Sequence, residues 1–247
     1  MAVSAPSLQS KVMAKHPYTI VRGGKLLDIA KRSAAPADIL IKGDTIAEIG
    51  RPGLAAPAGA VTVDAANRLL HPGLVNAHTH GPGNLGKGMG DLWSLELLLT
   101  ASPWINGGRT LEDKYLSSLI GACEMVMKGC TAAYDLAAEF PLPSVDGLSA
   151  MAKAYEEVGM RAVLAPMVAD LTFFEAIPGL MERLSPALQK EVEAYRLAPW
   201  KATTRQMRKA FQKWPFEKVT LAVAPTIPHH CTDDFLIACR DLAREFD

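Results

Sequence analysis

The chain has 247 residues, of which 49% are hydrophobic and 21% charged. This is the composition of a globular protein with enough apolar side chains for a sizeable core. Lys plus Arg and Asp plus Glu number 26 each, so no net charge favours nucleic acid or an anionic membrane as partner. No stretch approaches the roughly 18 apolar residues of a membrane span. The four cysteines lack C-x-x-C spacing. Together with the absence of a membrane span, this spacing predicts a cytoplasmic protein with reduced thiols.

The first part of the chain predicts an arm followed by a small β domain. Residues 1–16 show no hydrophobic periodicity and are expected to form a flexible arm. The segment "DILIKGDTIAEIG" then alternates apolar and polar residues around Gly43-Asp44, which is a two-residue hairpin signal. With the apolar runs on either side of it, residues 17–68 are expected to form a small β unit.

From Leu69 onward, strand and helix patterns alternate four times. The expected helices cover residues 110–128, 145–158, about 179–213 with an interruption near Pro199, and a last one that begins at Thr232. Thr110 with Asp113 makes a capping box. The four strand candidates are "GLVNAHTH", "CTAAYD", "RAVLAPMVAD" and "KVTLAVAPTI". Apolar strands of this kind are typically buried on both faces of a parallel sheet, which would be an open sheet or half of an eight-stranded barrel.

Two histidines stand one residue apart at the end of the first of these strands. Residues at positions i and i+2 of a strand point to the same side, so His78 and His80 could direct both rings at one metal ion. The carboxyl end of a parallel strand is also where α/β folds place their active sites. The alternative is a pair of ordinary histidines at a strand end.

A second motif, "GPGNLGKG" at residues 81–88, overlaps this site and nearly matches a phosphate-binding loop. Gly88 stands where that loop needs Ser or Thr, and Pro82 removes one backbone N–H from a phosphate cradle. We therefore interpret the segment as a flexible loop over the site, with nucleotide binding as the alternative.

Polar residues at the other strand ends are candidates for contacts with a substrate. His229, His230, Asp170 and Asn84 are the four residues predicted to bind substrate. Asp135 could also line a pocket, although Asp at a strand end is as often a turn former or a helix cap. Adjacent histidines cannot easily face the same space, so only one of His229 and His230 is expected to face the site and contact substrate. The alternative is a loop histidine in water.

These residues resemble the amidohydrolase superfamily, and more narrowly its branch of cytosine/guanine deaminases and chlorohydrolases. The resemblance rests on "LLHPGLVNAHTH" after the β unit, with "GMRAVLAPMVAD" and "APTIPHHCTDDFL" as the third and fourth strands, and spans roughly residues 18–247. It implies a (β/α)₈ barrel, of which residues 69–247 would form the first four βα units, preceded by part of a small β-sandwich. It also implies one divalent metal ion, zinc or alternatively iron, that activates water to attack a small heterocyclic substrate.

In this resemblance His78 and His80 match the first two metal ligands, and the histidine after the fourth strand matches a substrate contact. The family's remaining ligands and its general acid and base come from later strands, so we expect them beyond residue 247. Lys218 precedes the fourth strand, where it cannot take the place of a metal-bridging lysine, which favours the one-metal branch. The alternatives are a dinuclear cyclic-amidase relative, a nucleotide-binding domain and a non-catalytic fragment, with self-association left open.

Overall fold

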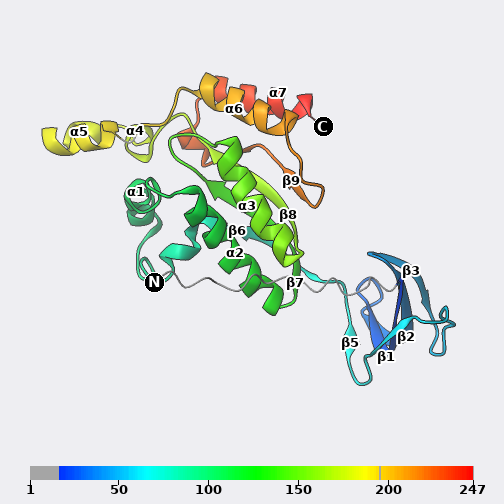
Figure 1. The fold of residues 1–247 in the computed structure, drawn as a ribbon. Helices are drawn as coiled ribbons and strands as arrows, with labels where there is room; N and C mark the ends of the chain where they lie inside the picture. The colour runs from blue at the N-terminus through cyan, green and yellow to red at the C-terminus, as the bar shows by residue number, and fades with distance from the viewer. Residues whose placement is uncertain (1–16, 195, 247) are drawn as a thin grey trace, which may run out of the picture. The chain divides into compact units, whose positions relative to one another are not determined.

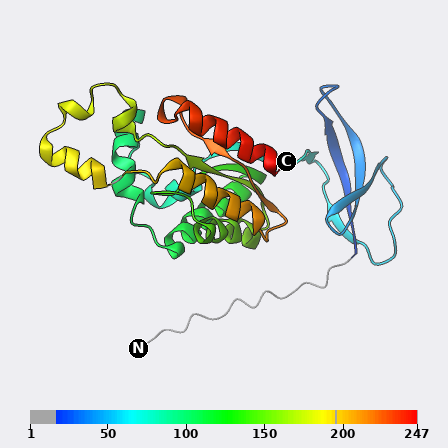
Figure 2. The same ribbon diagram turned by 90° about the horizontal axis from the view of Figure 1, so that it is seen from above.

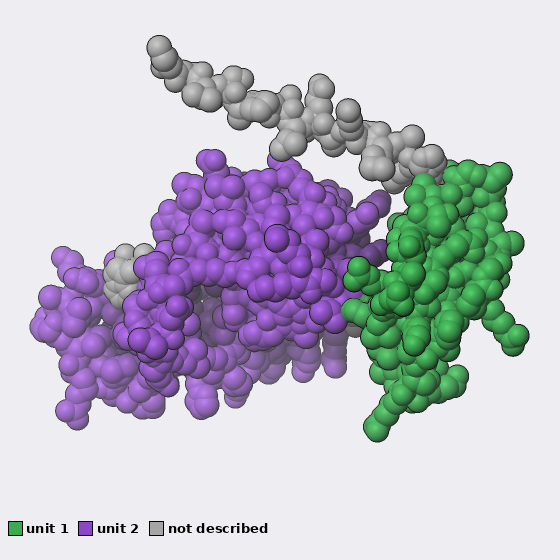
Figure 3. Space-filling model, turned by 90° about the horizontal axis from the view of Figure 1, so that it is seen from below, with its two compact units in different colours: residues 1–72 green, residues 73–247 purple. Residues whose placement is uncertain are grey.

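The computed structural model describes residues 17–194 and 196–246. The chain divides into two compact units, residues 1–72 and residues 73–247 (Figure 3). The predicted arm at residues 1–16 lies outside the described residues. No helix in the described part is long and apolar enough to cross a membrane.

The first unit is built on one five-stranded sheet. Its strands are β1 (Tyr18–Asp28), β2 (Ser33–Lys42), β3 (Thr45–Gly50), β4 (Val61–Asp64) and β5 (Leu69–Leu70). They run in the order β3-β2-β1-β4, with β5 also paired to β1. The predicted hairpin at Gly43-Asp44 is confirmed, because Lys42 pairs with Thr45 across the two-residue loop. Gly43 has φ of +61°, a conformation that glycine adopts without strain.

A buried carboxylate ties this sheet to a loop of the same unit. Asp38 is 2% exposed, and its side chain accepts hydrogen bonds from the Arg22 guanidinium at 2.7 Å and from the Gly53 N–H at 2.9 Å. Burial by itself raises the pKa of Asp38, but the hydrogen bonds from Gly53, Gly23 and Arg22 outweigh it and hold the pKa below its usual value. The ionised form therefore stabilises the folded unit.

We expect the replacement Asp38→Asn to destabilise the first unit at pH 7 much more than at pH 3. A carboxyl whose pKa is lower when folded contributes stability above its unfolded pKa, and that stability is lost as the pH falls through the folded value. Urea unfolding followed through the amide resonances of β1 and β2 measures the difference. Asp44→Asn, in the exposed hairpin turn, is the matched control. A loss of equal size at both pH values would contradict the role of the ionised carboxylate.

The second unit contains a parallel sheet whose strands follow one another in chain order. They are β6 (Leu74–Thr79), β7 (Cys130–Ala138), β8 (Arg161–Val168), β9 (Val219–Leu221) and β10 (Ala224–Pro225). Every pairing among them is parallel, and β9 and β10 both pair with β8. The predicted order of the four strands is thus confirmed. The fourth strand differs in being two short pieces, although Ala222 and Thr226 still donate backbone hydrogen bonds to β8.

Helices α2 (Leu111–Met127) and α3 (Val145–Val158) lie side by side on one face of this sheet (Figure 1). Their apolar sides form the main core, in which Leu148 and Met151 are at most 1% exposed. Complete burial of such a side chain stabilises the fold by about 1.5–3 kcal/mol. The predicted capping box of Thr110 and Asp113 is present. Gly159 ends α3 in the left-handed conformation.

The third crossover is broken into pieces rather than being one long helix. It contains α4 (Phe173–Ala176), a short 3₁₀ turn η2 (Met181–Arg183), α5 (Pro186–Ala194) and α6 (Trp200–Gln212), so the predicted interruption near Pro199 is confirmed. The last helix, α7 (Asp233–Glu245), begins after Thr232 as predicted and contacts α6. Figure 2 shows α4 and α5, in yellow, extending away from the sheet.

Two expectations for the start of this unit were wrong. The strand β6 is not buried: Leu74 and Val75 are 50% and 66% exposed, because β6 pairs only with β7 among the described strands. The segment after it is not a loop throughout either. Residues Gly81–Gly86 form a 3₁₀ helix, η1, and Leu95–Asn106 form a further helix, α1, that the sequence patterns did not predict.

Candidate metal centre and adjoining cavity

The two predicted histidines converge at the carboxyl end of β6. The His78 and His80 Nε2 atoms lie 3.2 Å apart, with the rings nearly perpendicular at 82°. The register of β6 against β7 shifts between Asn76 and Thr79, so the strand carries an irregularity where His78 stands. Irregularities of this kind often redirect side chains next to active sites. The predicted approach of the two rings is confirmed.

The orientation of His80 is fixed by its other ring nitrogen. His80 Nδ1 lies 3.0 Å from the carbonyl oxygen of Leu136 in β7. A carbonyl oxygen can only accept, so Nδ1 carries a proton, and in the neutral ring Nε2 keeps its lone pair. Metal-binding histidines typically show this arrangement, in which a carbonyl sets the tautomer and the free nitrogen faces the ion.

The spacing of the two imidazoles fits a divalent metal ion. Two nitrogen ligands of tetrahedral zinc, each about 2.0–2.1 Å from the ion, lie roughly 3.3 Å apart. The observed separation of 3.2 Å is close to this value. At this distance either the His78 Nε2–H donates a hydrogen bond to His80 Nε2, or both nitrogens bind the same cation. Among the described residues no group of three or more His, Cys, Asp or Glu side chains joins the pair.

Asp135, in β7, contacts the residue that follows His80 and does not line the cavity described below. It is fully buried and accepts hydrogen bonds from the Gly81 N–H and from the Tyr155 hydroxyl, both at 2.8 Å. Burial raises the pKa of Asp135, and the two hydrogen bonds oppose that rise. The pKa of Tyr155 is raised as well, first by burial and then by the neighbouring carboxylate.

The segment "GPGNLGKG" does not offer a phosphate cradle. Three of its N–H groups already have partners: the Gly81 N–H bonds to Asp135, the Gly83 N–H to the His80 carbonyl at 2.8 Å, and the Leu85 N–H to the Ser117 hydroxyl at 3.2 Å. Lys87 pairs with Glu124 in α2. Hydrogen bonds and ion pairs with Lys128 and Lys87 lower the pKa of Glu124 to about 2. The geometry therefore speaks against the nucleotide-binding alternative.

Two of the predicted substrate contacts bond to the protein itself. The Asn84 amide donates to the Gly81 carbonyl at 2.9 Å and packs so closely on Gly121 of α2 that a Cβ there would overlap it. Asp170 accepts from both the N–H and the hydroxyl of Thr232, at 2.9 and 2.5 Å, and so anchors the start of α7. Neither residue lines the cavity described next.

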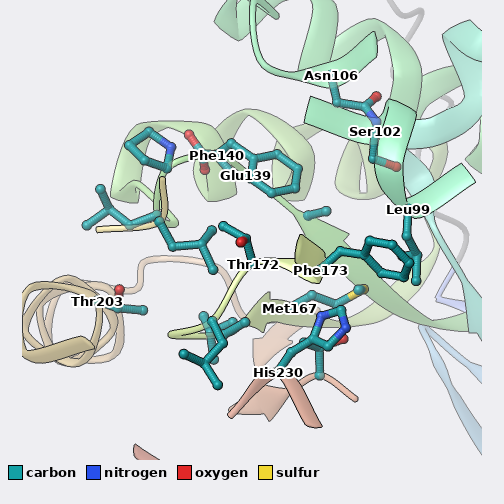
Figure 4. A pocket seen from close by; sticks show the side chains of 18 of the residues that line it. Leu99, Ser102, Asn106, Glu139, Phe140, Met167, Thr172, Phe173, Thr203 and His230 are labelled. Atoms are coloured by element: carbon teal, nitrogen blue, oxygen red, sulfur yellow. The ribbon is translucent and has the colours of Figure 1, made fainter. Parts of the chain in front are cut away.

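A cavity of about 150 Å³ opens at the carboxyl ends of β7, β8 and β10, the edge at which parallel α/β folds bind ligands. His230 lines it, whereas His229 is exposed and does not. Figure 4 shows His230 beside Phe173 and Met167, with Ser102 and Asn106 of α1 on another wall. Burial lowers the pKa of His230, and His229 adds to the effect, so both favour the neutral ring.

The walls of this cavity are largely apolar, with a few polar groups between them. Sequence patterns did not single out most of these residues, because they come from separate loops and helices. The only sequence-level signal is their place just after strands, as for Phe140 and Phe173. The labelled lining residues are Leu99, Ser102, Asn106, Glu139, Phe140, Met167, Thr172, Phe173, Thr203 and His230.

Comparison with known proteins identifies the family. A model described as "Amidohydrolase family" matches residues 69–247. The chain belongs to the amidohydrolase family. The resemblance expected from "LLHPGLVNAHTH" is thus confirmed.

The amidohydrolase relatives of this chain include named deaminases. A 5-methylthioadenosine/S-adenosylhomocysteine deaminase of Symbiobacterium thermophilum is 30% identical over 237 residues, which cover 92% of this chain and 46% of the relative. A 5'-deoxyadenosine deaminase of Methanocaldococcus jannaschii is 30% identical over 211 residues, covering 85% and 44%. The chain therefore spans about half the length of the curated relatives it matches.

Solved amidohydrolase structures share the fold. Atrazine chlorohydrolase TrzN of Arthrobacter aurescens TC1, complexed with zinc, superposes with a TM-score of 0.74 at 20% identity, over 93% of this chain and 51% of that one. Guanine deaminase of E. coli gives a TM-score of 0.68 at 18% identity, over 94% and 51%. At these identities the likeness establishes the α/β fold alone.

Proposed function

We propose that this chain forms the first half of a metal-dependent hydrolase that removes the amino group from a heterocyclic small molecule. The observation that carries the proposal is the pair of imidazole nitrogens 3.2 Å apart at the carboxyl edge of a parallel sheet. The names of the relatives support deamination, since two of them are deaminases of adenosine derivatives. The related chlorohydrolase fold is the reason to keep C–Cl hydrolysis as a second reaction of the same class.

In this proposal residues 17–68 belong to a small β-sandwich, and residues 69–247 form the first four βα units of a (β/α)₈ barrel. The order of β6, β7, β8 and β9 supports the barrel, because neighbouring strands follow each other in the chain. All four cysteines are free thiols, as in proteins of reducing compartments, which supports a cytoplasmic enzyme.

His78 and His80 would hold one divalent metal ion, zinc or alternatively iron. Such an ion lowers the pKa of a bound water toward neutrality, so that hydroxide becomes available at pH 7. The Leu136 carbonyl holds the proton of His80 on Nδ1 and leaves Nε2 free to bind. Further ligands and the general acid and base would come from outside the described residues.

The cavity would receive the heterocycle. Its aromatic and aliphatic walls suit a flat, weakly polar ring, and the His230 ring, which in its neutral form has one donor and one acceptor nitrogen, can hydrogen-bond to it. Phe173 lies edge-on to His230, with ring centroids 6.1 Å apart, and holds the ring against the cavity wall. Among the predicted contacts we retain His230 as the strongest, while His229, Asn84 and Asp170 would need to rearrange to reach a ligand there.

The test is ammonia release by the product of the complete reading frame, loaded with zinc. Substrates are 5'-deoxyadenosine, 5-methylthioadenosine, S-adenosylhomocysteine and guanine, with a chlorinated triazine assayed for chloride. We expect turnover of at least one aminated substrate, and its loss in His78→Ala together with loss of bound metal. Absence of turnover on every substrate by a protein that does bind zinc would contradict the proposed reaction.

A further inference from the structure

The segment that carries the two histidines is poorly held by the sheet itself. Regular pairing of β6 with β7 is interrupted between Asn76 and Thr79, and it ends with the pair Thr79 and Asp135. His80 and Gly81 lie beyond the last paired residue. Something other than the strand ladder must therefore keep the His80 ring in place.

Two consecutive residues of β7, Asp135 and Leu136, hold this segment in place. The Leu136 carbonyl accepts from His80 Nδ1 at 3.0 Å, and the Asp135 carboxylate accepts from the Gly81 N–H at 2.8 Å. One contact thus fixes the ring, and the other fixes the peptide group that follows it. Asp135 and Leu136 are adjacent in β7, which pairs with a strand on each side. The two contacts therefore restrain His80 together.

The Asp135 side chain is itself immobilised. It is 0% exposed, and the Tyr155 hydroxyl, also on a fully buried residue, donates to its second oxygen at 2.8 Å. Residue 81 must be glycine for the approach to be this close, since a Cβ there would overlap Asp135 Oδ2. Without an acceptor at residue 135, the buried Gly81 N–H would be left unpaired, which is unfavourable.

We propose that Asp135 is a positioning residue for His80: through the Gly81 N–H it fixes the backbone from which His80 presents Nε2 to a divalent metal ion. The inference rests on the proposed function for the identity of the ion. In this proposal Asp135 acts through the Gly81 N–H, which bonds to its carboxylate.

The test compares Asp135→Ala, Asp135→Asn and Tyr155→Phe in the 247-residue chain. One readout needs no metal: two-bond ¹H–¹⁵N correlation spectra of the imidazole rings report which nitrogen of His80 carries the proton. The other is the zinc dissociation constant from calorimetry. Asp38→Asn is the matched control, because it alters a buried, hydrogen-bonded carboxylate in the first unit.

In the wild-type chain His80 should show the Nδ1–H form. Asp135→Ala should give a mixture of tautomers and a zinc dissociation constant raised about 10-fold, the lower end of the range for residues that orient metal ligands. Asp135→Asn should keep the wild-type tautomer of His80 and the wild-type zinc dissociation constant, because its amide oxygen still accepts from the Gly81 N–H. Tyr155→Phe removes only one oxygen atom and should change both readouts in the same direction as Asp135→Ala, and Asp38→Asn should change neither.

A folded Asp135→Ala chain with wild-type tautomer and zinc affinity would overturn the inference. If that variant does not fold, an unchanged Tyr155→Phe chain would overturn it instead. The inference would also be overturned if Asp135→Asn changed the His80 tautomer and the zinc affinity as much as Asp135→Ala does. The oxygen that accepts from Gly81 would then be present without effect. If the wild-type chain binds no zinc while the tautomer responds as expected, the positioning role stands and the proposed metal site fails.

Discussion

Replacing His80 with alanine is expected to weaken zinc binding by the 247-residue chain by about 100-fold or more. Residues that merely orient a ligand contribute roughly 10–100-fold to metal affinity, so loss of a ligand itself should reach at least the top of that range. His78→Ala should behave alike, because the two Nε2 atoms lie 3.2 Å apart and one alone offers zinc a single nitrogen. Isothermal titration of the metal-free chains with zinc gives both constants.

His71→Ala is the control for these two variants. His71 is exposed, lies in the first unit, and its Nδ1 contacts the Pro72 carbonyl oxygen at 2.6 Å. Its loss removes an imidazole from the chain without changing the pair at β6, so zinc affinity should stay at the wild-type value. Zinc affinity that falls equally in all three variants, or in none, would mean that the ion binds elsewhere.

The elements that the sequence predicted well are those set by local rules. Thr110 with Asp113 begins α2, and Gly159 in the left-handed conformation ends α3, because each involves only neighbouring residues. The strand order of the second unit follows from the βα repeats in the same way. These features need no knowledge of distant contacts.

The region between residues 81 and 106 depends on distant contacts instead. Three glycines near Lys87 disfavour a regular helix locally, and they suggested a loop. In the structure the Ser117 hydroxyl contacts the Gly81 carbonyl oxygen at 2.8 Å, and Asn84 packs on Gly121, so α2 holds η1 in place. Tertiary packing outweighs the local propensity here, and a pattern confined to neighbours cannot register it.

The candidate site also combines features that local rules predict with features that depend on distant contacts. Strand geometry was enough to predict that His78 and His80 face one space, although the irregularity in β6 could not be foreseen. Asp135 and Asp170 both follow apolar strand residues, and the sequence could not distinguish them. Their roles differ because Asp135 meets Gly81 and Tyr155 in the core, while Asp170 meets Thr232 at the start of α7.

The 247-residue chain by itself is expected to release no ammonia from any adenosine derivative or from guanine, even with zinc present. Catalytic zinc sites have three protein ligands and leave the fourth position to water, and the described residues bring together only two imidazoles. Within residues 17–194 and 196–246, no carboxylate joins the two rings to take a proton from a bound water. The exposed edge of β6, with Leu74 half exposed, also leaves the site open to solvent.

A coupled assay with glutamate dehydrogenase measures the ammonia, and the chain carrying His80→Ala defines the background from contaminating deaminases. The wild-type chain should not exceed that background, whereas the product of the complete reading frame should. Because the two 247-residue chains differ only at one ring, a wild-type rate clearly above the variant's would mean that two histidines suffice. The further zinc ligands and the general base would then have to come from the 247-residue chain, for example from a second copy of it. The proposal that residues outside this chain supply them would be wrong.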